Sequence, residues 1–164
     1  MAENLNYKVS KIYCYENKVS NCAKYGRLYA WNAVMDSNNA TYPVQGVCPS
    51  GWHLPENYEW EVLLKFVGRS SAGKALKSRA GWFGGGDGTD DFGFSAIPAG
   101  IRYGNGKYSS DGRYALFWGP EPYLLKYNNN DGNFVQKRDD LSVSVRCVKN
   151  VPKGTMTDSR DGQT

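Results

Sequence analysis

Apolar residues in the first half of the chain recur at helical spacing in two stretches. In residues 24–35, KYGRLYAWNAVM, most apolar side chains lie three or four positions apart, and a polar run from Asp36 is a stop signal. In CPSGWHLPENYEWEVLLKFVG, Pro55 stands at the head of a second such pattern, and Gly68 is a suitable residue to end it. We therefore predict two helices, at residues 24–35 and 55–67.

The segment GRSSAGKA, residues 68–75, is one hydroxyl group short of a phosphate-binding loop. Such a loop follows a buried strand and leads into a helix, whereas this segment follows the second predicted helix. Ala75 also stands where a Ser or Thr should ligate magnesium. We interpret the segment as a helix exit followed by a short helical turn, with a nucleotide site as the weaker alternative.

Short runs of β-type residues dominate the second half of the chain. They follow a loop of glycines and aspartates, WFGGGDGTDDFG, and turn-forming segments such as GNGKYSSDG and NNNDG separate them. Helices first and strands afterwards predict an α+β fold, with two helices packed on a mostly antiparallel twisted sheet. The predicted strands lie in FSAIPAGIRY, RYALFWG, PYLLKY, NFVQKR and LSVSVRCVK.

The composition is that of one domain with a single core, since the chain has 164 residues of which 40% are hydrophobic. The net charge of +4 comes from interspersed basic and acidic residues, so we expect no nucleic-acid partner. The apolar runs are only a few residues long, and we expect no membrane insertion. The 12 tyrosines, 5 tryptophans and 19 glycines favour short strands, tight turns and exposed rings.

Four cysteines, Cys14, Cys22, Cys48 and Cys147, are better explained by disulfides than by a zinc site, because they form no C-x-x-C pair and His53 is the single histidine. Three pairings are possible. The spacing favours a local Cys14–Cys22 loop and a long-range Cys48–Cys147 bond. Such bonds imply an oxidising compartment, so we expect an extracellular, secreted or cell-surface protein; reduced thiols in a cytosolic protein are the alternative.

Residues 1–150 form the predicted domain. Residues 151–164 are almost without apolar side chains and are expected to be a linker or tail. The opening MAENLNYKVS has no apolar stretch of the kind found in a secretion leader. We therefore expect the export signal to lie outside this sequence.

Several segments resemble the Fibrobacter succinogenes major paralogous domain, a module of secreted bacterial proteins. They are MAENLNY, YCYEN, NCAKYGRLYAW, CPSGWHLPENYEWE, GTDDFGFSAIPAGIR, ALFW and SVSVRCVK, and they cover most of residues 1–150. The resemblance implies a C-type-lectin-like fold whose first and last strands lie together, with the Cys147 strand returning to the part that carries Cys48. The tail TDSRDGQT resembles the opening of such a module, so we expect a piece of a tandem array that lacks one N-terminal strand.

The resemblance to C-type lectins also raises the question of a calcium-dependent sugar site. Glu121-Pro122 is similar to the start of the Glu-Pro-Asn triplet of those lectins, but Tyr123 replaces the asparagine and no Trp-Asn-Asp triplet follows. The formylglycine-generating enzymes share the wider fold, but their paired active-site cysteines have no counterparts here. We expect neither of these mechanisms.

The strongest candidate for a ligand-binding face is residues 118–138. Rings can stack on sugar C–H surfaces, while Asn and Asp offer donors and acceptors to hydroxyl groups; the same mixture suits protein recognition. An Asn-rich turn with tyrosines packed along a sheet is the structural alternative. The candidate residues are Trp118, Tyr123, Tyr127, Asn128, Asn129, Asn130, Asp131 and Arg138, with Tyr103, Tyr108 and Arg113 beside them.

Other polar groups are weaker candidates. Asp87, Asp90 and Asp91 could hold Ca²⁺, although turn and capping roles are favoured, and we expect no other cofactor. His53 has no partner residues of a catalytic kind and is expected to be structural. Four rings at periodic or motif positions are assigned to the core: Trp31, Trp52, Trp60 and Phe94.

No paired carboxylates or nucleophile motif indicate an enzyme. We therefore expect a non-enzymatic extracellular binding or adhesion module that recognises a polysaccharide or a cell-surface protein. The alternatives are a structural spacer among neighbouring modules of one chain, and a variable ligand-display domain of the type that retroelements diversify.

Overall fold

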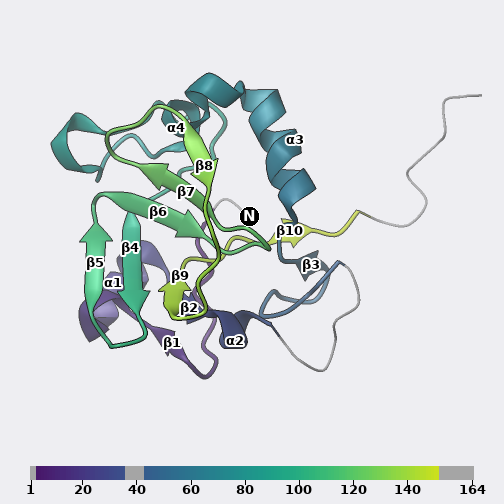
Figure 1. The fold of residues 1–164 in the computed structure, drawn as a ribbon, viewed down its shortest axis with the longest axis vertical. Coiled ribbons are helices and arrows are strands. Elements are labelled where there is room, and N and C mark those ends of the chain that lie inside the picture. The colour runs from purple at the N-terminus through teal and green to yellow at the C-terminus, as the bar shows by residue number, and fades with distance from the viewer. Residues whose placement is uncertain (1–2, 36–42, 152–164) are drawn as a thin grey trace, which may run out of the picture.

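The computed structural model describes residues 3–35 and 43–151 (Figure 1). The helices are α1 (Val19–Tyr25), α2 (Trp31–Val34), α3 (Asn57–Val67) and α4 (Ala72–Leu76), with 3-10 turns at Tyr15–Asn17, Arg69–Ser71 and Phe83–Gly85. The strands are β1 (Ile12–Tyr13), β2 (Leu28–Ala30), β3 (Trp52–His53), β4 (Ala99–Tyr103), β5 (Tyr108–Asp111), β6 (Tyr114–Phe117), β7 (Tyr123–Lys126), β8 (Gly132–Phe134), β9 (Leu141–Val143) and β10 (Val148–Lys149).

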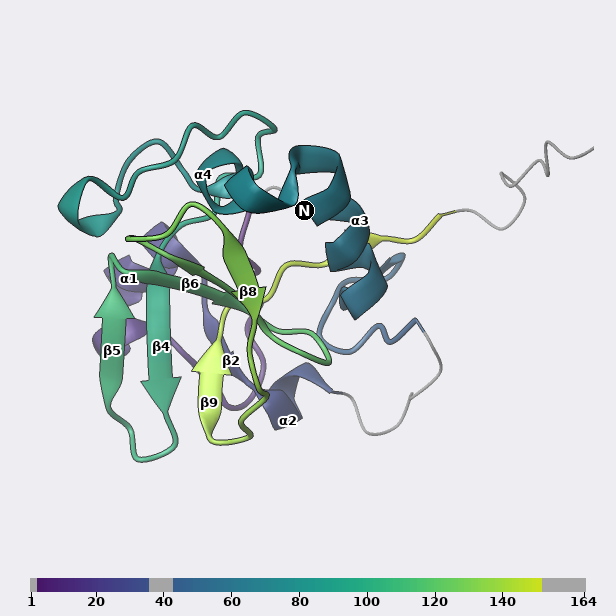
Figure 2. The same ribbon diagram turned by 45° about the horizontal axis from the view of Figure 1, so that its top comes forward.

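The strands form three antiparallel sheets. One is five-stranded in the order β1-β2-β9-β4-β5, one is three-stranded in the order β6-β7-β8, and β10 pairs with β3. Figures 1 and 2 both show α3 and α4 on the side of the three-stranded sheet. The fold is therefore α+β with few helices and antiparallel pairing, as the order of the sequence patterns predicts.

The segment 141–149 connects all three sheets. Its start, β9, pairs with β2 and β4, and its end, β10, pairs with β3. Between them, Ser144 forms a parallel bridge to Phe117 at the end of β6. The backbone amide of Leu5 donates to the carbonyl of Val145, so the first described residues lie against this segment as well.

Helix α3 confirms the second predicted helix, although it begins at Asn57 rather than at Pro55. The Glu59 carboxylate accepts the backbone amide of Glu56, which would otherwise lack a helical partner. Trp60, Leu64 and Val67 face the core. Gly68 has a φ of 86° and follows the last helical residue, and the predicted short helical turn after it is α4.

The first predicted helix, residues 24–35, is wrong as a continuous helix. Its first two residues end helix α1, strand β2 follows, and the chain is helical again only in the four residues of α2. Gly26 adopts a φ of 74°, which interrupts the helix, and β2 then fills the gap between β1 and β9. Pairing with two distant strands overrides the local helical pattern.

The predicted strands are present in shortened form, and GNGKYSSDG is not only a turn. Its second half is β5, an edge strand that pairs with β4. Because the strand lies at the edge of the sheet, it tolerates the serines and aspartate that made the segment resemble a loop. LSVSVRCVK divides into β9 and β10 because the chain passes from one sheet to another at Ser144.

Both predicted disulfides are confirmed. Cys14 is bonded to Cys22, and Cys48 is bonded to Cys147 across 99 residues. The second bond lies in the largest core cluster, which also contains Tyr29, Trp118 and Val143. A second cluster, under α3 and α4, contains Trp60, Leu76, Phe117 and Tyr123.

Among the described residues, no helix is both long and apolar enough to cross a bilayer. Residues 152–164, which include almost all of the predicted tail, lie outside the described residues, as does the polar run from Asp36.

Candidate functional site

The structure divides the predicted face of residues 118–138 between the core and two separate surfaces. Trp118 and Tyr123 are fully buried. The indole of Trp118 donates to the carbonyl of Tyr29, and its ring packs on Trp31 with centroids 5.1 Å apart. The expectation that these two rings belong to a ligand-binding face is therefore wrong.

Tyr123 is buried because α3 covers its side of the three-stranded sheet. Its ring is stacked on Trp60, with centroids 4.8 Å apart, and meets Phe134 edge-on. Burial raises the pKa of its hydroxyl, and no hydrogen-bond partner for that hydroxyl is found among the described residues. Tyr123 thus holds α3 to the sheet and offers no contact to solvent.

The first surface joins the β5–β6 turn, the end of β7 and the glycine-rich loop. The Arg113 guanidinium lies 3.8 Å from the centre of the Phe83 ring and 5.4 Å from that of Tyr127. Phe83 and Tyr127 meet edge-to-face with centroids 5.4 Å apart. Phe83 is 51% exposed, and Arg113 and Asn128 are also exposed. We call Phe83, Arg113, Tyr127 and Asn128 the Phe83 corner.

A buried lysine fixes the turn that carries Tyr127 and Asn128. The ammonium group of Lys77 is 3.2 Å from the carbonyl oxygen of Lys126 and 3.0 Å from that of Asn129, and it donates to both. Burial lowers the pKa of Lys77, but the two carbonyl dipoles partly replace the lost hydration. The backbone on both sides of Tyr127 is therefore held from beneath.

The glycine-rich loop approaches the same turn closely. Gly84 and Gly85 have φ values of 60° and 77°, which place the preceding Phe83 at the loop tip. A β-carbon on Gly86 would overlap the carbonyl group of Tyr127, so only glycine allows the observed contact. The two segments are consequently packed backbone to backbone.

The remaining residues of the NNNDG turn serve the protein itself. The Asn130 carbonyl accepts the backbone amide of Lys74, and Gly73 packs on the Asp131 carbonyl. These contacts occupy the GRSSAGKA segment, where a phosphate-binding loop would need free backbone amides. Asn129 and Asp131 are half-buried, so Asn128 and Asn130 are the exposed members of the turn.

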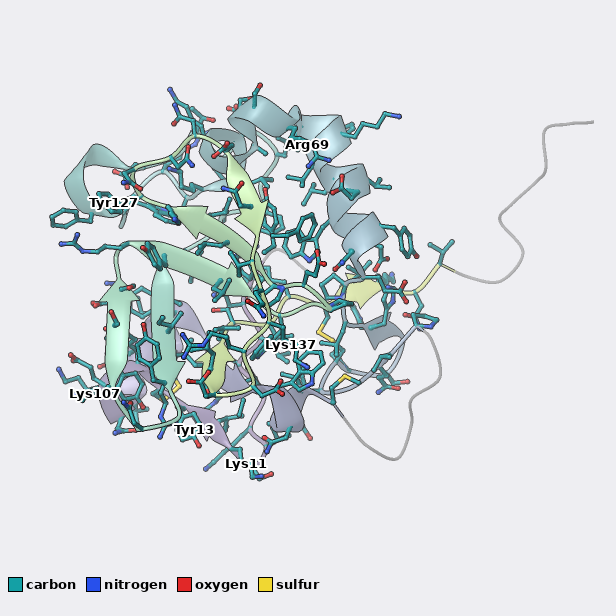
Figure 3. All side chains as sticks on the ribbon, viewed as in Figure 1. Lys11, Tyr13, Arg69, Lys107, Tyr127 and Lys137 are labelled. Carbon is teal, nitrogen blue, oxygen red and sulfur yellow. A yellow bond between two sulfur atoms is a disulfide. The ribbon has the colours of Figure 1, made fainter. Side chains whose placement is uncertain are left out.

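The second surface lies on the five-stranded sheet, at the opposite end of the molecule from Tyr127 in Figure 3, where Tyr13 and Lys107 are labelled. The Arg102 guanidinium is 3.6 Å from the centre of the Tyr13 ring and 5.9 Å from that of Tyr108. Arg138 lies 6.0 Å from the Tyr103 ring and forms a two-bond ion pair with Asp140. Tyr108 thus lies with Arg102, whereas Tyr103, the next residue of β4, lies with Arg138 and packs against the largest core cluster.

The three aspartates of the calcium hypothesis accept hydrogen bonds at three different places. Asp87 accepts the Trp82 amide, Asp90 accepts the Ser95 amide, and Asp91 accepts the Thr89 hydroxyl. Within residues 3–35 and 43–151, no group of three His, Cys, Asp or Glu side chains is arranged to hold a metal ion.

His53 is buried between two chain segments. Its Nδ1 is 2.6 Å from the Asn150 side-chain oxygen, and its Nε2 is 2.9 Å from the Glu59 carboxylate. It connects β3 with α3 and the end of β10. Of the rings assigned to the core, Trp60 is buried, and Trp31, Trp52 and Phe94 are partly buried against the clusters.

Sequence reasoning missed Phe83, Tyr13 and Arg102. Phe83 lies beside Trp82 in a stretch of glycines, and the sequence gives no sign that Trp82 is buried while Phe83 is exposed. The run of glycines directly after Phe83 is the one local signal for a loop tip. Arg102 is on a strand, where the alternation of side chains could have placed it on the opposite face from the buried Ile101.

The fold and these surfaces define a disulfide-bonded α+β domain with exposed rings held on packed loops. The model of the Fibrobacter succinogenes major domain matches residues 1–149, and the chain belongs to this family. The match confirms the resemblance found in the sequence. No curated protein and no solved structure matches the chain.

Proposed function

We propose that this domain is a non-enzymatic extracellular binding module and that the Phe83 corner is its contact face. The observation that carries this proposal is the half-exposed Phe83 ring, held in place by the Arg113 guanidinium and the Tyr127 edge. A ring of this kind offers a flat apolar face to a sugar or to a side chain of another protein. The exposed Asn128 amide beside it offers a donor and an acceptor.

The rigidity of the corner supports a binding role over a loop without function. Lys77 fixes the turn through two carbonyls, and Gly86 brings the loop against Tyr127. Rings that are already ordered lose little conformational entropy when a ligand binds. A glycan is the favoured ligand, because one aromatic face with adjacent amide and guanidinium donors suits a sugar ring and its hydroxyl groups.

The proposal extends to the fold type and the compartment. A C-type-lectin-like arrangement is supported by the contacts that bring the chain ends together: the β3–β10 pairing, the Leu5–Val145 hydrogen bond and the Cys48–Cys147 bond. Two disulfides support an oxidising, extracellular setting.

A glycan array, combined with pull-down from bacterial surface extracts, tests the contact face. Phe83→Ala and Arg113→Ala should each weaken binding about tenfold or more, since each removes part of the ring platform. Tyr108→Ala, on the other surface, is the control and should bind as the unsubstituted domain does.

The outcomes separate the candidate functions. Binding that is lost with Tyr108→Ala and retained with Phe83→Ala would move the site to the second surface and overturn the proposal. Binding to extracts but to no glycan would favour a protein ligand, as a display domain would have. No specific binding at all would favour the structural spacer.

A further inference from the structure

Helix α3 carries an apolar stripe on its outer face. Tyr58, Val62 and Phe66 are 61%, 64% and 73% exposed and lie four residues apart, so they line one side of the helix. The inner face of the same helix is packed into the core through Trp60, Leu64 and Val67. The helix is therefore apolar on both faces, although a surface helix needs only one.

The apolar surface continues beyond the helix on one flank. The Phe92 ring, 48% exposed, meets Phe66 edge-on with centroids 5.4 Å apart. A groove of about 680 Å³ runs between α3 and the β10 end of the chain. Its walls include Leu63, Phe94, Val148 and the exposed Val151. The patch is wide enough to be an interaction surface rather than a scatter of single side chains.

The opposite flank of the stripe is charged, with Glu61 and Lys65 one helical turn apart, and Glu61 also forms an ion pair with Arg69 of its own chain. In an antiparallel pair of identical helices related by a twofold axis, the same flanks face each other. If two α3 helices cross at Val62, the rise of about 1.5 Å per residue leaves Glu61 of each copy about 3 Å along the axis from Lys65 of the other, within reach of these long side chains. The same register puts Tyr58 of each copy opposite Phe66 of the other.

We propose that two copies of this chain associate through α3, antiparallel and centred on Val62. Tyr58 and Phe66 form two reciprocal aromatic contacts beside the groove, and Glu61 and Lys65 form two reciprocal ion pairs on the other flank. The small Val62 side chain at the centre lets the helices approach closely. The surface is distinct from the Phe83 corner, so this inference stands apart from the proposed function.

Charge reversal on one flank tests the register as well as the association. Glu61→Lys leaves only cations on that flank, and Lys65→Glu leaves two carboxylates with Arg69 as the remaining cation. Each variant should be monomeric in sedimentation velocity at concentrations where the unsubstituted domain is a dimer. An equal mixture of the two variants should form a heterodimer, and the double variant carrying both substitutions should regain the homodimer.

A second test places a charge at Val62, the centre of the proposed dimer contact. Val62→Glu should raise the dimer Kd about a hundredfold, because it buries unpaired carboxylates at the axis. Val19→Glu is the matched control: Val19 is 80% exposed on α1, which lies away from α3 in Figure 1. It should leave the dimer unchanged.

Three results would overturn the proposal. The first is an unsubstituted domain that stays monomeric over a hundredfold range of concentration. The second is a dimer that survives Val62→Glu. The third is a mixture of the two charge variants that does not associate, which would rule out the antiparallel register. Glycan or extract binding by the monomeric variants is unaffected in each case, so the two proposals fail separately.

Discussion

Lys77 and Arg146 are buried cations whose hydrogen bonds go to backbone carbonyls or to an amide side chain. Arg146 donates to the carbonyls of Phe94 and Ser95 and to the side-chain oxygen of Asn4. Its burial lowers the pKa to about 10. Each cation binds backbone carbonyls of segments that have little regular structure of their own. Single buried residues therefore fix the shape of the surface at these places.

Two tyrosines that are fully buried in the described part of the chain, Tyr29 and Tyr123, differ in their hydroxyl partners. The Tyr29 hydroxyl donates to the carbonyl of Tyr7 at 2.7 Å, whereas that of Tyr123 has no partner in the described part of the chain. Tyr29→Phe should therefore lower the free energy of unfolding by about 1 kcal/mol at neutral pH. Tyr123→Phe should not lower it. Urea unfolding of the two variants makes the comparison.

The same two side chains predict how stability changes at alkaline pH. Burial raises the pKa of both hydroxyls, so the unfolded chain loses these protons before the folded one does. Stability should be unaffected by them below about pH 10 and should fall as pH rises above it. The lowered pKa values of Lys77 and Arg146 act in the opposite direction. Each Tyr→Phe change should make the decline shallower; an unchanged slope would contradict the assignment.

Among the elements, the glycine-rich loop 81–88 is held by backbone contacts with neighbouring segments. It contains one 3-10 turn, Phe83–Gly85, and it reaches the three-stranded sheet through Gly86 and Tyr127. The Trp82 amide donates to the Asp87 carboxylate, which closes the loop from within. The position of the Phe83 ring therefore depends on Gly86 and Asp87, which lie outside the Phe83 corner.

Gly86→Ala should displace this loop, because its β-carbon would overlap the Tyr127 carbonyl group. We expect a loss of about 1–3 kcal/mol in the free energy of unfolding, together with weaker binding at the Phe83 corner. Gly104→Ala is the control, since its β-carbon would be 3.3 Å from the nearest atom, the Asp140 carbonyl oxygen. Equal stability of the two variants in urea would show that the loop moves without cost.

On the scale of the whole molecule, the Cys48–Cys147 bond joins the early and late halves of the chain. It lies beside the β3–β10 pairing and within the largest core cluster. Cys14–Cys22 closes a loop between residues only 8 apart, ahead of and within α1. The two bonds therefore restrict the unfolded chain to very different extents.

Replacing each pair of cysteines by alanine tests this difference. The chain-entropy relation gives about 4.7 kcal/mol for a loop of about 100 residues and about 3 kcal/mol for one of about 15. Cys48→Ala with Cys147→Ala should thus lower the urea midpoint more than Cys14→Ala with Cys22→Ala. The reverse order would mean that local geometry at Cys14, rather than loop length, dominates disulfide stabilisation here.

The sequence alone determined the features that depend on local signals. Helix α3 follows from its apolar period and from Gly68, and the turns between the late strands follow from Gly, Asn and Asp. The disulfide pairing follows from spacing, since Cys14 and Cys22 are close and leave Cys48 and Cys147 to each other. These features need no knowledge of what else packs nearby.

Only the tertiary structure decided which rings are exposed and where residues 24–35 become a strand. Trp118 is buried in a contact with Tyr29, which is 89 residues away in the sequence. Tyr123 is buried because α3 covers it. Leu28–Ala30 is a strand because β1 and β9 lie on either side of it. Burial and strand pairing depend on contacts between distant segments. An aromatic residue with the same neighbours along the chain can therefore lie in the core or on a binding surface.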